Sequence, residues 1–330
     1  MQCYRCQFLL TIIFLLFLIY VTIDTYAQVR IEKNKSVNES ITNFVLIPTI
    51  KNAVELEAFR IKKLDLETTQ AMQNISIKLN EDGESLVKRY PALIKVNKQP
   101  AGLNFYKINW DSYPQGVVKI EHGQHSFVLE NVLGIMGSQD LEIPQEGIDE
   151  FSIYMSLAGT PQGLISHDEA RLKTYALLKK IELTGWRNLI SEDDPRITGK
   201  DRLNYVLKVS NLIGLDTKYI PTLEEWMSIE NLTSWTFYAD HQYLRVDFKR
   251  ERTLLDPAKP GSYLLTFSLK SETENFRGYV GPDNRSVWKQ KLPAALDDLK
   301  QRRQKAEATL RAQGISIDET YQDPPVPDLK

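Results

Sequence analysis

Apolar side chains alternate with polar ones along part of this 330-residue chain, and this alternation limits what the chain can fold into. Within residues 235–251 the apolar set is Leu244, Val246 and Phe248, and the polar set is Arg245, Asp247 and Lys249. A period of two places each set on its own face of a β-strand. Residues 239–241 predict a turn from a preceding strand, 235–238. Because residues 263–269 repeat the alternation, we expect a three-stranded antiparallel meander with one buried face.

A long helix is predicted near the C-terminus, from about Asp283 to Gln313, with Pro293 kinking or restarting it. Its apolar stripe consists of Leu292, Leu296, Leu299, Ala306 and Leu310. We expect this stripe to cover the meander. The basic run 300–305 is expected to be a solvated helix face, although contact with anionic headgroups or an acidic partner is an alternative.

The remaining chain predicts an α+β fold, with antiparallel sheets, packed helices and two subdomains behind an N-terminal hydrophobic segment. Strands are expected at 43–50 and in a hairpin over 116–137 with Gly123 in its turn, and Asp82-Gly83 predicts another turn. The expected division is 1–27 as signal-anchor or signal peptide, 28–158 and 159–318 as α+β domains, and 319–330 as a flexible tail. Residues 314–318 are expected to form a last strand.

Residues 8–23 are an unbroken apolar run that follows a short segment carrying Arg5. The run favours an uncleaved signal-anchor, and cleavage after Ala27 is the alternative. We therefore expect a transmembrane helix in the bacterial inner membrane, with the body of the chain in the periplasm. The only cysteines, Cys3 and Cys6, precede the run, so the exported part has no disulfide. A net charge of −2 without a basic stripe argues against a nucleic-acid partner.

The consecutive residues Ser166, His167 and Asp168 have the composition of a catalytic triad but not its arrangement. Three consecutive side chains point in different directions, whereas a triad needs its base beside both partners. The same residues, with Glu169, predict a capping box at the start of a helix that ends near Thr184.

Two other groups of residues are candidate sites. Glu121, His122 and His125 lie at the hairpin turn, where a solvated tip is favoured over a metal site. Asp193, Asp194 and Arg196 lie in a polar loop, 191–199, that is also expected to be solvated. No G-x-S-x-G, P-loop, H-E-x-x-H or G-x-G-x-x-G motif occurs in the sequence, so we expect no enzyme, no metal and no cofactor.

Several segments resemble a family of uncharacterised, N-terminally anchored proteobacterial proteins. They are ISHDEAR, DPRITG, YIPTLEEWM, WTFYAD, LRVDFKRE, GSYLLTFSL and GISIDETYQDPP, and the resemblance is best over residues 163–325. The family is associated with type VI secretion gene clusters that encode lipase-type effectors. The resemblance implies an immunity-type envelope protein that binds and neutralises such an effector. An effector adaptor, or an envelope hydrolase that uses residues 191–199 with His122 and His125, are the alternative hypotheses.

Overall fold

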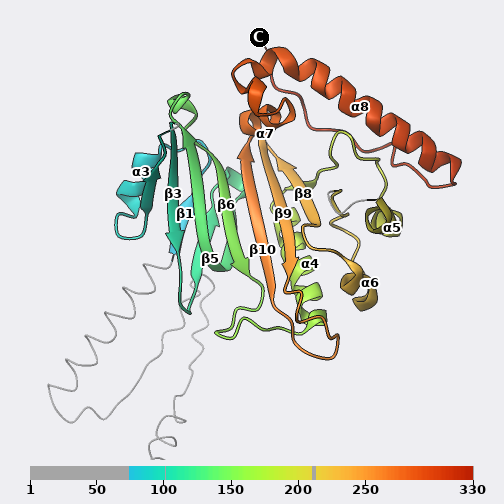
Figure 1. Ribbon diagram of the computed structural model, residues 1–330, viewed down its shortest axis with the longest axis horizontal. Coiled ribbons are helices and arrows are strands. Elements are labelled where there is room, and N and C mark those ends of the chain that lie inside the picture. Colours follow the sequence, from blue (N-terminus) through green and yellow to red (C-terminus); the bar gives the residue numbers. More distant parts are fainter. Residues whose placement is uncertain (1–73, 101, 210–212, 330) are drawn as a thin grey trace, which may run out of the picture. The chain divides into compact units, whose positions relative to one another are not determined.

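A computed structural model describes residues 74–100, 102–209 and 213–329, all of which belong to one compact unit (Figure 1). The apolar run 8–23, the cleavage position at Ala27 and the predicted strand 43–50 lie outside the described residues. In the part of the chain that is described, no helix has both the length and the apolar character needed to cross a bilayer.

The described chain has an α+β fold built on one ten-stranded sheet, as the sequence predicts for the fold class. The strands are β1 (Asn74–Ile77), β2 (Lys95–Lys98), β3 (Leu103–Asn109), β4 (Gly116–Ile120), β5 (Phe127–Asp140), β6 (Ile148–Ser156), β7 (Arg187–Asn188), β8 (Ser234–Ala239), β9 (Gln242–Arg250) and β10 (Tyr263–Ser271). Their order is β1-β4-β5-β6-β10-β9-β8-β7, and β3 joins both β2 and β5. The β1–β4 pair is parallel, while the other described pairs are antiparallel.

Six α-helices and three 3₁₀ turns accompany the sheet in the described residues. The helices are α3 (Gly83–Arg89), α4 (His167–Leu183), α5 (Gly199–Val209), α6 (Leu223–Ser228), α7 (Glu272–Tyr279) and α8 (Trp288–Ala312), and the turns are η1 (Gly123–His125), η2 (Pro144–Glu146) and η3 (Pro282–Val287). The predicted C-terminal helix is confirmed, with Pro293 inside it and Gly314 behind it at φ 80°. The predicted strand at 314–318 is wrong, because these residues are not in a strand.

The meander of β8, β9 and β10 is confirmed. Val246 at its centre lies opposite Trp235 on one side and Phe267 on the other. Asp240 and His241 form the hairpin turn with φ values of 37° and 65°. Positive φ at both central residues is typical of the tight turns that match strand twist. The β4–β5 hairpin around η1 is confirmed as well.

The helix that covers the buried face of the meander is α4 rather than α8 (Figure 1). Ala170, Leu178 and Ile181 on α4 are fully buried in the same cluster as the inward side chains of the strands. The prediction that α8 covers this face is therefore wrong. The apolar part of α8 packs instead with α7 and with Tyr238 and Tyr243, in a second cluster. A hydrophobic stripe identifies the buried side of a helix but not the element that it meets.

The sheet continues across the predicted subdomain boundary at residues 158 and 159. β6, before the boundary, pairs with β10, after it, from Leu264↔Ser156 to Lys270↔Glu150. The division into two subdomains stays a prediction. The turn expected at Asp82-Gly83 is wrong, because Asp82 caps α3: its carboxylate accepts a hydrogen bond from the Ser85 amide at 3.0 Å. An Asx side chain suits a helix N-cap as well as a turn.

Candidate partner-binding cavity

A cavity of about 520 Å³ lies on the face of the meander opposite α4. The strands line it with the outward residues of their alternation, which are Ser234, Thr236, Tyr243, Arg245, Asp247, Ser268 and Lys270. Asn275 and Tyr279 of α7 form one wall, and the loop Leu189–Arg196, called the wall loop below, forms another through Ser191, Asp193 and Asp194. The volume lies within the range of ligand pockets, about 300–1,000 Å³.

Two buried hydroxyl groups line the cavity without a hydrogen-bond partner among the described residues. They belong to Tyr243, which is 4% exposed, and to Ser234, which is fully buried. Burial raises the pKa of Tyr243, so its hydroxyl is neutral and can both donate and accept. A buried polar group without a partner costs about 1–3 kcal/mol. The hydrogen-bonding capacity of these two hydroxyls is therefore unused within the described residues, although both oxygen atoms are covered in this conformation.

Most charges around the cavity are already paired. Arg245 donates to Asp247 at 2.9 Å, Lys270 lies 3.7 Å from Glu150, and Arg202 donates to Asp194 at 2.7 Å. An additional ion would have to compete with these pairs. A neutral group with both donors and acceptors, such as an amide or a hydroxyl, fits this lining better.

The wall loop buries acidic side chains, so the expectation that it is solvated is wrong. Glu192 and Asp194 are 5% and 9% exposed. Burial raises the pKa of Glu192, although the Tyr279 hydroxyl donates to it. Burial likewise raises the pKa of Asp194, and Arg202 opposes this effect. Arg202 also donates to the carbonyl of Pro195 at 2.9 Å, which ties the loop to α5.

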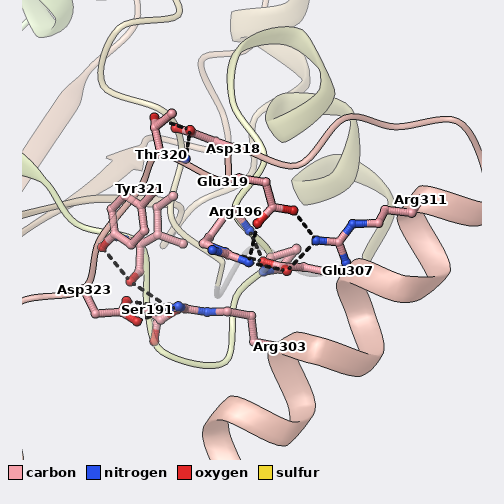
Figure 2. Close-up of polar contacts among 12 residues, drawn as sticks. Ser191, Arg196, Arg303, Glu307, Arg311, Asp318, Glu319, Thr320, Tyr321 and Asp323 are labelled. Atoms are coloured by element: carbon pink, nitrogen blue, oxygen red, sulfur yellow. Dashed lines mark hydrogen bonds and ion pairs between the residues drawn. The ribbon is translucent and has the colours of Figure 1, made fainter.

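The outer side of the wall loop is held by α8 and the C-terminal tail (Figure 2). The Ile190 amide donates to the Tyr321 hydroxyl at 2.9 Å, and that hydroxyl lies 3.2 Å from the Ile190 carbonyl. Arg303 donates to the Ser191 carbonyl at 2.7 Å and to both carboxylate oxygens of Asp323. The tail 319–330, which is expected to be flexible, thus makes specific polar contacts with the wall loop and with α8. The basic run 300–305 is exposed as expected, except for Arg303, which is only 7% exposed.

Arg196 points away from the cavity and pairs with Glu307. Two guanidinium nitrogens of Arg196 donate to the two carboxylate oxygens of Glu307, each at 2.8 Å. Burial alone would raise the pKa of Glu307, but the hydrogen bonds from Arg196 lower it below its ordinary value. Asp193, Asp194 and Arg196 form one candidate site in the sequence. In the structure only the two aspartates line the cavity.

The structure separates Ser166, His167 and Asp168 by role. Ser166 caps α4 by accepting from the Glu169 amide at 3.2 Å, which confirms the N-cap half of the predicted capping box but not the return bond from Glu169. Glu169 itself pairs with Lys173 at 3.0 Å. His167 is 1% exposed and hydrogen-bonds to the Tyr263 hydroxyl, and Asp168 pairs with Arg171. The three side chains face different partners, as the cap prediction requires.

His122 and His125 pack against the ends of β8 and α4. His122 Nε2 lies 3.0 Å from the Ala239 carbonyl, and His125 Nδ1 lies 2.8 Å from the Thr184 carbonyl. Burial lowers the pKa of His122. Glu121 accepts from the hydroxyl of Ser76. The tip is solvated only in part, since Gly123 and Gln124 are exposed whereas the two histidines are half-buried. Among the described residues no three potential ligands are grouped to hold a metal. Neither histidine lines the cavity.

Sequence reasoning missed Tyr243 and Arg202. The sequence does contain a sign of Tyr243, because this aromatic residue lies on the same outward face of β9 as Arg245 and Asp247. Arg202 carried no comparable signal, since its burial depends on a loop that precedes it by several residues. Comparison of the chain with protein-family models, curated proteins and solved structures finds no match.

Proposed function

We propose that this chain is a membrane-anchored, periplasmic immunity-type protein that binds a type VI secretion effector of the lipase class and neutralises it. The proposal combines the family resemblance with the N-terminal apolar run, which supplies the anchor. A protein placed on the outer side of the inner membrane meets a lipase before the enzyme reaches the phospholipids.

The observation that carries the proposal is the cavity with its two unpartnered hydroxyls, Tyr243 and Ser234. A loop of the effector inserts a neutral polar side chain there, an amide or a hydroxyl, and pairs with both groups. Buried and desolvated pockets of this kind provide most of the energy of a protein interface, and tyrosine is enriched among the residues concerned. Arg245, Asp247 and Lys270 form a polar rim around the inserted group.

The test is a competition between sibling bacteria. A strain that lacks this gene is mixed with a strain that delivers the lipase-type effector encoded beside it. We expect the deletion strain to be killed, the wild-type gene to restore survival, and a Tyr243→Phe gene to restore it only in part. Full survival of the deletion strain would contradict the proposal. If the deletion instead abolishes secretion of the effector, the chain is an adaptor and not an immunity protein.

A further inference from the structure

We propose that residues Asp318–Leu329 form a releasable strap that keeps the wall loop, and with it the cavity, in its binding conformation. The first observation is the direction of the strap, which runs antiparallel to α8 (Figure 1). Glu319 pairs with Arg311, Asp323 with Arg303, and Leu329 packs in the cluster that contains Trp288. The strap therefore follows α8 back toward its first turn.

The second observation is that the strap and α8 together hold three successive parts of the wall loop. Tyr321 pairs with both backbone groups of Ile190, and Arg303 links Asp323 to the Ser191 carbonyl. At the far end of the loop, the Asp318 amide donates to the Arg196 carbonyl at 2.6 Å. Figure 2 shows Tyr321, Asp323 and Arg303 beside the loop. Ser191 and Asp193 of the same loop line the cavity.

The polar nature of its contacts allows the strap to be released without unfolding the sheet. Its contacts are mainly hydrogen bonds and ion pairs, and several of the groups are solvated: the Glu319 side chain is 61% exposed and that of Asp323 is 32% exposed. It buries little apolar surface, since Val326 is 46% exposed and Pro324 is its only buried residue among those described. Segments with few buried apolar contacts open at lower free energy than the core. Ion pairs with exposed partners are also weakened by salt.

Release of the strap has a direct consequence for the cavity. Without Tyr321 and Arg303–Asp323, the Ile190–Ser191 backbone loses its outer partners. Arg202, Tyr279 and Arg302 still hold the loop, but Ser191 and Asp193 are held less firmly at the rim. A partner that binds the ordered cavity then finds only part of the protein in the binding conformation. The apparent affinity for that partner is therefore lower. This consequence rests on the proposed function, whereas the coupling between strap and wall loop does not.

Hydrogen–deuterium exchange of the full-length protein in detergent micelles tests the coupling without any partner. The variants are Tyr321→Phe, which removes only the hydroxyl at Ile190, and Asp323→Asn, which removes the charge that orients Arg303. Asp297→Asn is the matched control, because it neutralises an exposed carboxylate on α8 that contacts Gln301 and not the wall loop. Tyr243→Phe serves as a cavity control.

We expect both strap variants, and 1 M salt on the wild type, to raise exchange in residues 189–196 by roughly tenfold, with no change in β9 and β10. The two control variants should leave exchange of the wall loop at the wild-type rate. Unchanged exchange of the wall loop in both strap variants would overturn the proposal, as would an equal rise in the strands, which would indicate global destabilisation. If exchange responds as expected and no effector binds even the wild type, the proposed function fails and the strap stands.

Discussion

Arg202 on α5 and Asp194 in the wall loop form a buried ion pair, in which Nη2 of Arg202 lies 2.7 Å from Oδ2 of Asp194. Their side chains are 3% and 12% exposed. Removing one partner of such a pair leaves an uncompensated charge in the interior. The pair therefore fixes the wall loop to α5 from the inside, while the strap holds it from the outside.

We predict that Arg202→Met lowers the free energy of unfolding by about 3–5 kcal/mol, because it leaves the buried Asp194 carboxylate without a cationic partner. Denaturant titration followed by tryptophan fluorescence measures this change. Lys200→Met is the control: Lys200 lies on the same helix but is half exposed and pairs with Glu225 at the surface, so its loss should cost less than about 1 kcal/mol. Equal effects of the two substitutions would contradict the assigned role of the pair.

A second prediction concerns the pH dependence of stability through Asp149 on β6. Burial raises the pKa of Asp149 to about 7, Glu274 and Glu146 reinforce the shift, and Arg277 and Arg285 oppose it. The folded state then binds more protons than the unfolded state between pH 3.8 and about 7. The stabilising contribution of this group is complete below pH 3.8 and is lost as the pH rises through about 7.

Asp149→Asn should remove this part of the pH dependence. We expect the variant to gain stability relative to the wild type as the pH rises across that interval, by on the order of 2 kcal/mol or more. Glu142→Gln is the control, since Glu142 is an exposed carboxylate in the same region. Parallel stability curves for Asp149→Asn and the wild type would disprove the prediction.

A third prediction uses the close approach of α3 to β3. A Cβ atom added at Gly83 would lie 1.9 Å from the ring of Tyr106, whose hydroxyl is fixed by Gln139 at 2.8 Å. Gly83→Ala should therefore lower the free energy of unfolding by about 1–3 kcal/mol. At Gly278 in α7 a Cβ meets no atom within 4 Å, so Gly278→Ala should be neutral or stabilising by up to about 1 kcal/mol. In thermal melts, the melting temperature of Gly83→Ala should fall, whereas that of Gly278→Ala should stay unchanged or rise.

A fourth prediction is topological and tests the compartment on which the proposed function depends. If the apolar run 8–23 directs the following chain across the inner membrane, as proposed, alkaline phosphatase fused after Lys330 should be active in bacterial cells. A fusion that lacks residues 1–27 should be inactive. An inactive full-length fusion with normal expression would place the body in the cytoplasm and remove the immunity proposal.

Local patterns predicted local structure well, because the physics behind them is local. The alternation at Leu244, Val246 and Phe248 predicted β9, and Ser166 predicted the start of α4. The prediction of which helix packs on the meander was wrong, because α4 and not α8 covers its buried face. The buried side of α8 also includes Arg303 and Glu307, which pair with Asp323 and Arg196 from segments far apart in sequence.

The cavity could be predicted only in part. Asp193 and Asp194 mark the wall loop as a candidate in the sequence, and the alternation indicates the outward face of β9. That these segments face each other depends on how the loop after α4 runs beside β8, where the Leu189 amide donates to the Thr236 carbonyl at 2.8 Å. No periodicity in the sequence encodes that contact.

The central claim is that the effector pairs with the buried hydroxyls of the cavity, and the affinity of the purified full-length protein for the effector, with and without the Tyr243 hydroxyl, tests it most directly. Calorimetric titration should show Tyr243→Phe binding roughly tenfold more weakly than the wild type. The same substitution should leave the free energy of unfolding unchanged or raise it by up to about 1 kcal/mol, because the hydroxyl has no partner among the described residues. Equal affinities of the wild type and Tyr243→Phe would contradict the account.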